Sequence, residues 1–254
     1  MLVPMLALGT LTAISGKPLT TTSASTLTVF QNLPQILLWL WLNILVNCIG
    51  NQRNPSSIIE DSLNKPWRPI VVGRISAAKA KHLLLGVIPL TVVLGMMFDV
   101  GFETLACICA AYYYNDLGGA DEHFLIRQVI NGLAFPGYGL AVLKLAAGPV
   151  DILPATYAWL GLLGLVAGTT IQIQDLKDYE GDKAFNRHTF PVVIGDDFTR
   201  VSVCAGILFW LDLKTLGSLL YLFAFVVCGL LINVEVMSYV EEIVYRPCFF
   251  PRIL

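Results

Sequence analysis

The chain consists mostly of apolar segments long enough to cross a lipid bilayer. A membrane-spanning helix needs roughly 20 apolar residues, and shorter segments are tolerated near kinks. The N-terminal stretch MLVPMLALGTLTAIS is expected to be a short or truncated first span. The other candidate spans lie near residues 27–50, 83–98, 102–115, 124–148, 152–173, 200–213 and 215–236. This pattern predicts an all-α fold, a polytopic transmembrane helical bundle of about eight spans.

The scarcity of charge supports a membrane location. Charged residues make up 13% of the chain and hydrophobic residues 56%, whereas soluble domains carry about 25% charged residues. A soluble chain this apolar could not cover its core with polar surface, but lipid solvates apolar surface. The net charge is -2 and no basic stripe is present, so no nucleic acid is expected as a partner.

Lysine and arginine are concentrated in two long polar loops, residues 51–82 and 174–200. The short turns near 99–101 and 146–152 contain neither. Because positive loops stay in the cytosol, both long loops are predicted to lie there. The turn NDLGGADEH (115–123) follows the first loop by two spans and is therefore cytosolic too. Three polar loops are thus predicted to converge as a cytosolic cap on the bundle.

The stretch QIQDLKDYEGDKAFNRHTF places several carboxylates directly after an apolar segment. Asp175, Asp178 and Asp182 are spaced so that one helix would present all three on one face. Their repulsion, which is costlier at a membrane boundary, would be removed by Mg²⁺, an ion that commonly shares carboxylates with a substrate phosphate. Spacing alone leaves open a solvated loop whose aspartates pair with neighbouring cations, namely Lys177, Lys183 and Arg187.

The loop NQRNPSSIIEDSLNKPWRPI (51–70) supplies a second set of charges. Glu60 and Asp61 are followed by Lys65 and Arg68, so carboxylates and cations again occur together. Two acidic clusters on one side of a bundle, each flanked by basic residues, suit a diphosphate. Carboxylates would hold Mg²⁺, and cations would bind the phosphate oxygens.

Polar and aromatic residues predict a cavity inside the bundle. Asn43, Asn47 and Asn51 repeat every four residues, and buried amides in lipid favour a polar cavity. Tyrosines at 112, 113, 114 and 138 could shield a carbocation, although aromatic residues of membrane helices more often face lipid or the interface. Tyr114 and Asn115 are the expected substrate contacts. Arg127 would either reach a diphosphate or extend to the headgroups.

Together the two loops resemble the aspartate-rich motifs of the UbiA superfamily of intramembrane prenyltransferases. NQ…ED..NKPWRP..GRIS resembles that family's N-x-x-x-D-x-x-x-D region, and DLKDYEGDKAFNRHTFPVVIG resembles its D-x-x-x-D region. The similarity spans about residues 30–235. The segment YYYNDLGGADEHFLIRQVINGLAF further resembles the fungal branch of membrane-bound terpene cyclases. One departure is that the first motif lacks its middle aspartate and carries Glu60 beside Asp61.

The resemblance implies a single membrane domain over residues 1–254, shortened at its N-terminus and in its last span. It implies two Mg²⁺ ions that bridge both motifs to a prenyl diphosphate. The implied metal ligands are Glu60, Asp61, Asp175, Asp178 and Asp182. The expected catalytic residues are Asn51, Asp61, Asp178 and Asp182. The expected substrate-binding residues are Lys65, Arg68, Tyr114, Asn115, Arg127 and Lys177.

The expected reaction is Mg²⁺-dependent ionisation and cyclisation of a prenyl diphosphate, farnesyl before geranylgeranyl, to a terpene of secondary metabolism. One alternative is prenyl transfer to an aromatic or quinone-type acceptor, which needs the same metal site and an acceptor pocket. Another is a transporter or non-catalytic membrane protein whose aspartates bind cations. The fungal resemblance implies the endoplasmic reticulum membrane, an active site facing the cytosol, and pathway oxygenases as partners.

Overall fold

The computed structural model describes residues 2–212, and within them the chain forms eleven α-helices. Contacts divide the chain into two compact units after Val203, and the first unit contains α1 to α10 and the start of α11. The all-α prediction is confirmed. The prediction of one domain over residues 1–254 stays a prediction.

Four helical segments among the described residues are long and apolar enough to cross a membrane. They are α2 (Thr26–Gln52), α4 (Ala77–Met97), α6 (Phe124–Ala147) and the segment Pro154–Leu176, which contains α7 (Pro154–Thr170) and α8 (Ile173–Leu176). The other predicted segments are not established as membrane spans by the described residues. Helices α1 (Leu2–Ser15) and α5 (Gly101–Asn115) are shorter, α11 (Asp196–Asp212) begins earlier than expected, and segment 215–236 lies outside the described residues.

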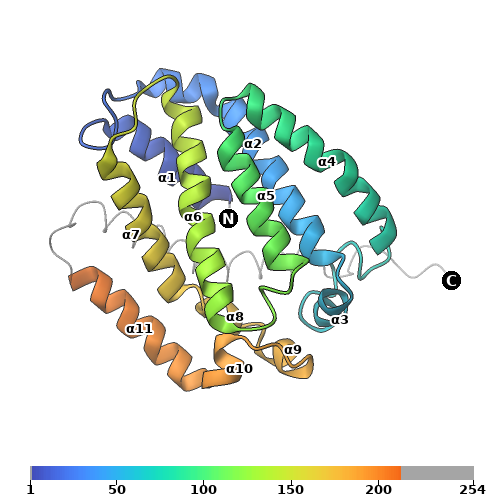
Figure 1. Ribbon diagram of the computed structural model, residues 1–254. Helices are drawn as coiled ribbons and strands as arrows, with labels where there is room; N and C mark the ends of the chain where they lie inside the picture. Colours follow the sequence, from blue (N-terminus) through green and yellow to red (C-terminus); the bar gives the residue numbers. More distant parts are fainter. Residues whose placement is uncertain (1, 213–254) are drawn as a thin grey trace, which may run out of the picture. The chain divides into compact units, whose positions relative to one another are not determined.

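Helix α6 is the centre of the packing. It contacts α1, α2, α5 and α7, and α4, α5, α6 and α7 lie in this order beside one another (Figure 1). The backbones of α6 and α7 approach closely at Gly132 and Gly164, where a Cβ on Gly132 would lie 2.9 Å from the carbonyl oxygen of Gly164. Small residues permit such contact between membrane helices. Helix α6, which lines the cavity, is therefore fixed against α7, the helix that leads into the second aspartate motif.

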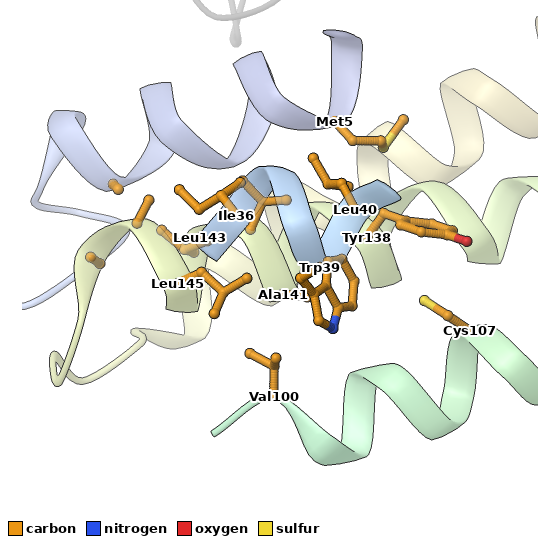
Figure 2. Packing of buried hydrophobic residues seen from close by; sticks show 14 of the residues in the cluster. Met5, Ile36, Trp39, Leu40, Val100, Cys107, Tyr138, Ala141, Leu143 and Leu145 are labelled. Atoms are coloured by element: carbon orange, nitrogen blue, oxygen red, sulfur yellow. The ribbon is translucent and has the colours of Figure 1, made fainter. Parts of the chain in front are cut away.

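An apolar core lies between α1, α2, α5 and α6 (Figure 2). Trp39 of α2 is buried and packs edge-on against Tyr138 of α6, with ring centroids 5.8 Å apart. The indole Nε1 of Trp39 donates a hydrogen bond of 2.8 Å to Thr104 Oγ1 of α5. This bond satisfies the one polar atom of the indole, so a large ring is buried without an unpaired donor.

The polar loops form a cap at one end of the helices. It contains three short helices besides α8, namely α3 (Pro55–Asn64), α9 (Tyr179–Ala184) and α10 (Phe190–Ile194), all at the lower end of Figure 1. Helix α3 packs against α9, and the His188 amide donates to the Asp121 carbonyl at 3.2 Å. All three predicted loops therefore meet, as the sequence indicates.

Candidate active site

A cavity of about 280 Å³ lies beneath this cap, between α2, α5 and α6. Charged side chains line the end next to the cap: Glu60, Lys65, Arg68, Arg127, Asp175, Lys177, Asp178 and Arg187. Mostly small, apolar or aromatic side chains and one amide line the part further along the helices: Cys107, Ala110, Ala111, Ile130, Asn131, Ala134 and Tyr138. One hollow thus joins a charged mouth to an apolar interior.

Each predicted carboxylate is paired with a cation, either from another part of the chain or from its own loop. Asp178 Oδ2 lies 2.8 Å from Lys65 Nζ, which links the second motif to the first. Asp175 Oδ1 lies 2.7 Å from Arg127 Nη2 of α6. Within the first loop, Asp61 Oδ2 accepts a hydrogen bond of 2.6 Å from Arg68 Nη1. The alternating charges hold two loops and one helix together.

The three aspartates of the second motif do not share the face of one helix. The helix ends after α8 at Leu176 and resumes with α9 at Tyr179, so Asp178 stands in the break. Three like charges on one face, within about two helical turns, would repel one another. The break lets each carboxylate reach a different cation. The three aspartates are close in sequence as predicted, but they lie on a turn between two short helices and not on one helix face.

Of the cations expected in a solvated loop, Arg187 pairs with Asp182, whereas Lys183 lies over the Tyr179 ring.

Arg187 is absent from the site residues that the sequence predicts. Its side chain is buried, pairs with Glu60, and contacts Asp182 Oδ1 at 3.3 Å and Asp121 Oδ1 at 2.6 Å. It therefore joins all three polar loops. The one feature of the sequence that could have identified Arg187 is its position five residues after Asp182. That position fits a residue in a solvated loop equally well.

Burial makes two of the carboxylates receptive to a further positive charge. It raises the pKa of Asp182 to about 6, although Arg187 acts to lower it. It also raises the pKa of Asp61, against the lowering effect of Arg68. Asp182 Oδ2 is buried and has no hydrogen-bond partner among the described residues. An unpaired carboxylate oxygen of this kind is costly, so a cation or a donor would stabilise it.

The residues at the mouth fit Mg²⁺ shared with a phosphate. In the part of the chain that the structure describes, no three Asp, Glu, His or Cys side chains converge into a closed metal site. Mg²⁺ rarely uses such a closed set, because it keeps waters and takes one or two carboxylates together with substrate phosphate oxygens. Asp175 and Asp178 both line the cavity and can supply those carboxylates.

A network of asparagines sets the wall of the mouth. Asn51 Nδ2 donates to Asn115 Oδ1 at 3.2 Å, and Asn115 Nδ2 donates to Asn47 Oδ1 at 3.0 Å. Asn47 and Asn51 line the cavity, whereas Asn115 supports them from behind. Asn43 donates to the Trp39 carbonyl within α2 and lies outside the lining. The polar stripe is therefore confirmed for two of its three members.

Tyr114 and Tyr138 are the tyrosines that line the cavity. The Arg127 guanidinium lies 5.5 Å from the centroid of the Tyr114 ring, next to its bond with Asp175. Tyr112 and Tyr113 are exposed and lie on another face of α5. Tyr114 and Arg127 both line the cavity, where a substrate contact would have to lie. Lys177 also lines the mouth, and no ion pair with another described residue holds it there.

Comparison with known proteins gives this architecture a family. Residues 2–242 match the UbiA prenyltransferase family over almost the whole chain. The chain belongs to the UbiA prenyltransferase family. It is therefore an integral, multi-pass membrane protein related to terpene cyclases and prenyltransferases.

Two curated relatives in the UbiA family are cyclases or synthases of terpenes. Somaliensene A/B synthase of Streptomyces somaliensis is 30% identical over 170 residues, which cover 67% of this chain and 55% of that protein. Diterpene cyclase eriG of Hericium erinaceus is 26% identical over 176 residues, which cover 69% and 56%. The chain thus spans little more than half the length of these two relatives.

A third UbiA relative is named as a transferase. Polyprenyl transferase eriF of Hericium erinaceus is 30% identical over 206 residues, which cover 72% of this chain and 67% of that protein.

A solved UbiA homolog from Archaeoglobus fulgidus, bound to GPP and Mg²⁺, has a similar structure. The superposition has a TM-score of 0.61 at 17% identity and covers 90% of this chain and 84% of that one. The structural match confirms a UbiA-like fold. The predicted family is thus correct, while the roles of individual residues stay predictions.

Proposed function

We propose that this UbiA-family protein ionises a prenyl diphosphate with the help of Mg²⁺ and cyclises the carbocation to a terpene. The observation that carries the proposal is the single cavity that joins a mouth of carboxylates and cations to an apolar interior with two tyrosines. The similarity to two terpene-forming relatives supports cyclisation. A structural homologue that binds GPP and Mg²⁺ supports the substrate class and the cofactor.

The mouth would bind the diphosphate through both kinds of charge. Asp175 and Asp178, assisted by Asp182, would hold one Mg²⁺, and Asp61 with Glu60 and Asn51 would hold the other. Mg²⁺ would supply positive charge that stabilises the departing diphosphate. Lys65 forms an ion pair with Asp178, and Arg127 forms one with Asp175. Both cations would therefore lie close to the phosphate oxygens of a diphosphate held at these carboxylates. Arg68 and Lys177 line the same mouth and would bind phosphate oxygens.

The interior would control the carbocation. Ionisation breaks the carbon–oxygen bond, and the diphosphate leaves with both bonding electrons. Ring closure uses the π electrons of the chain, and loss of a proton gives a neutral hydrocarbon. The apolar wall excludes water, which would otherwise capture the cation. The ring faces of Tyr114 and Tyr138 would stabilise positive charge along the cavity.

Cavity size favours farnesyl diphosphate over geranylgeranyl diphosphate. The volume of about 280 Å³ lies just below the ligand-pocket range of about 300–1,000 Å³. The basic loops favour a cytosolic mouth, and the fungal similarity favours the endoplasmic reticulum membrane and downstream oxygenases.

Prenyl transfer to an aromatic or quinone-type acceptor is the second candidate, because eriF is named as a transferase. An assay without any acceptor separates the two reactions. Microsomes that contain the expressed protein are given farnesyl diphosphate and Mg²⁺, and extracts are analysed by gas chromatography with mass detection. A new sesquiterpene hydrocarbon, absent from microsomes without the protein, is expected. Product formation only after an aromatic acceptor is added would replace cyclisation by transfer.

The replacement Ala134→Phe tests whether the interior holds the prenyl chain. One side of α6 lines the cavity with Arg127, Ala134 and Tyr138. Ala134 lies between Arg127 at the charged mouth and the Tyr138 ring further inside. A phenyl ring there would shorten the space. Because a misfit of even one methylene in an apolar pocket changes kcat/KM by about 10–200-fold, we expect kcat/KM for farnesyl diphosphate to fall at least about tenfold relative to geranyl diphosphate.

The control for this variant is Leu133→Phe. Leu133 is the preceding residue of α6, and its side chain is 68% exposed on the outer face. It should leave the ratio of the two kcat/KM values unchanged. Equal ratios in both variants would show that the chain does not pass Ala134.

A further inference from the structure

A second hollow of about 730 Å³ lies on the other side of α5, between α2, α4 and α5. Its wall is mainly apolar, with Val46, Leu84, Leu85, Ile88, Pro89 and Ile108 among its residues. It shares Ala111 with the catalytic cavity and otherwise has different lining residues. We call it the α2–α4–α5 groove. It plays no part in the proposed reaction.

Basic side chains stand at the end of the groove nearest the cap. Arg53 follows the last residue of α2, and Lys81 lies in the second turn of α4. Lys81 is exposed and forms no ion pair with any residue in the described part of the chain. Arg53 pairs with Asp116 through Nη2, but its buried Nε has no hydrogen-bond partner among the described residues. Two cations thus line the groove beside one carboxylate, Asp116.

We propose that this groove binds a phospholipid with an anionic headgroup. An acyl chain would lie along the apolar wall, and the phosphate would accept a hydrogen bond from Lys81 Nζ and lie beside the positive charge of Arg53. The positions are consistent with a bilayer, because α2 and α4 are both membrane-spanning candidates and the two cations stand at their cap ends. Headgroups lie at such helix ends, and basic residues there attract anionic lipids.

The charge at the rim decides which lipid is preferred. An acyl chain gains little by moving from the bilayer into an apolar groove, because lipid tails are equally apolar. Most of the selectivity must therefore come from the headgroup. The single carboxylate, Asp116, is already paired with Arg53, so the rim carries excess positive charge. It also lacks the set of carboxylates that a Mg²⁺-bound diphosphate would need, which separates this groove from the catalytic cavity.

Lipid titration of the purified full chain tests the proposal without any enzyme assay. The protein in a mild detergent is titrated with phosphatidylglycerol and, separately, with phosphatidylcholine of the same acyl chains, and bound lipid is counted by native mass spectrometry. We expect Lys81→Gln to weaken phosphatidylglycerol binding about fivefold, the factor that one basic residue at an anionic headgroup supplies. Ile88→Trp, which fills the groove, should weaken binding of both lipids.

The matched control is Lys79→Gln, the same change of charge two residues away. Lys79 is exposed on the same helix and lies outside the groove lining, so it should leave lipid binding unchanged. Thermal unfolding verifies that each variant is folded. Equal phosphatidylglycerol binding by the wild-type, Lys81→Gln and Ile88→Trp proteins would overturn the proposal. So would an equal loss in Lys79→Gln, which would indicate general charge attraction.

Discussion

Replacing Asp178 with Asn is expected to lower terpene formation from farnesyl diphosphate by roughly 10²–10³-fold, the effect of losing one electrostatic contact to charge that develops in a transition state. Asp178 lines the cavity mouth beside Asp175 and bonds to Lys65 of the first motif at 2.8 Å. Asparagine keeps the size of the side chain but removes the charge that would bind Mg²⁺. Initial rates are measured at several Mg²⁺ concentrations and divided by the amount of protein in the membrane.

The matched control is Glu180→Gln in the same motif. Glu180 is exposed, and it lies outside the cavity lining. It loses the same charge two residues further along, so its rate should stay within about twofold of wild type, as for most surface substitutions, which change energies by less than about 0.5 kcal/mol. Equal rates for Asp178→Asn and the wild type would remove Asp178 from the metal site. An equal loss in both variants would indicate a general effect of loop charge.

Replacing Arg187 with Gln is expected to destabilise the protein by about 3–5 kcal/mol, the usual effect of removing one partner from a buried ion pair. Arg187 is buried and neutralises Glu60 and Asp182, and it also contacts Asp121. Without it, two buried carboxylates would lose their principal counter-charge. Thermal unfolding of the purified protein in detergent measures the loss, and we expect a clearly lower Tm.

Mg²⁺ distinguishes a site role for this cluster from a purely structural one. If Glu60 and Asp182 are metal ligands, Mg²⁺ should restore part of the lost Tm in Arg187→Gln, because it supplies the missing positive charge. The control is Arg200→Gln: Arg200 is exposed, and its ion pair with Asp196 spans one helical turn, a kind of pair that contributes about 0.3–0.5 kcal/mol. Its Tm should change little. A Tm of Arg187→Gln that does not respond to Mg²⁺ would contradict metal binding by these carboxylates.

The membrane class and the two motifs could be predicted because each depends on local pattern. Apolar length indicates helices such as α2 and α6 irrespective of what packs against them. The position of Lys and Arg indicates the side on which loops 51–82 and 174–200 lie. Spacing also indicates the shared stripe of Asn47 and Asn51. The count of about eight spans could not be established in this way, because the segment predicted at 102–115 forms α5 (Gly101–Asn115), a helix of only 15 residues.

Pairing between distant residues could not be predicted from pattern. Lys65 meets Asp178, and Arg127 meets Asp175, across 113 and 48 positions of sequence. The sequence places suitable charges in the same cap, but many pairings would satisfy it equally. Tyr112 and Tyr114 show the same limit on one helix: a difference of two residues directs one to the groove and the other to the cavity.

Local sequence pattern was sufficient to identify lipid as the surroundings of the helices, an all-α fold, the UbiA family and the kinds of charged side chain in the polar loops. Packing of the helices and the cap was needed to see which cation neutralises which carboxylate, where α8 ends and α9 begins, and that Arg187 joins the three loops. The difference arises from the distance along the chain over which each interaction acts. Hydropathy and helix periodicity act over a few turns of chain and are written in consecutive residues. The energy of a buried charge depends on every neighbour within a few ångströms, and those neighbours are set only when α2, α6 and the cap have packed together.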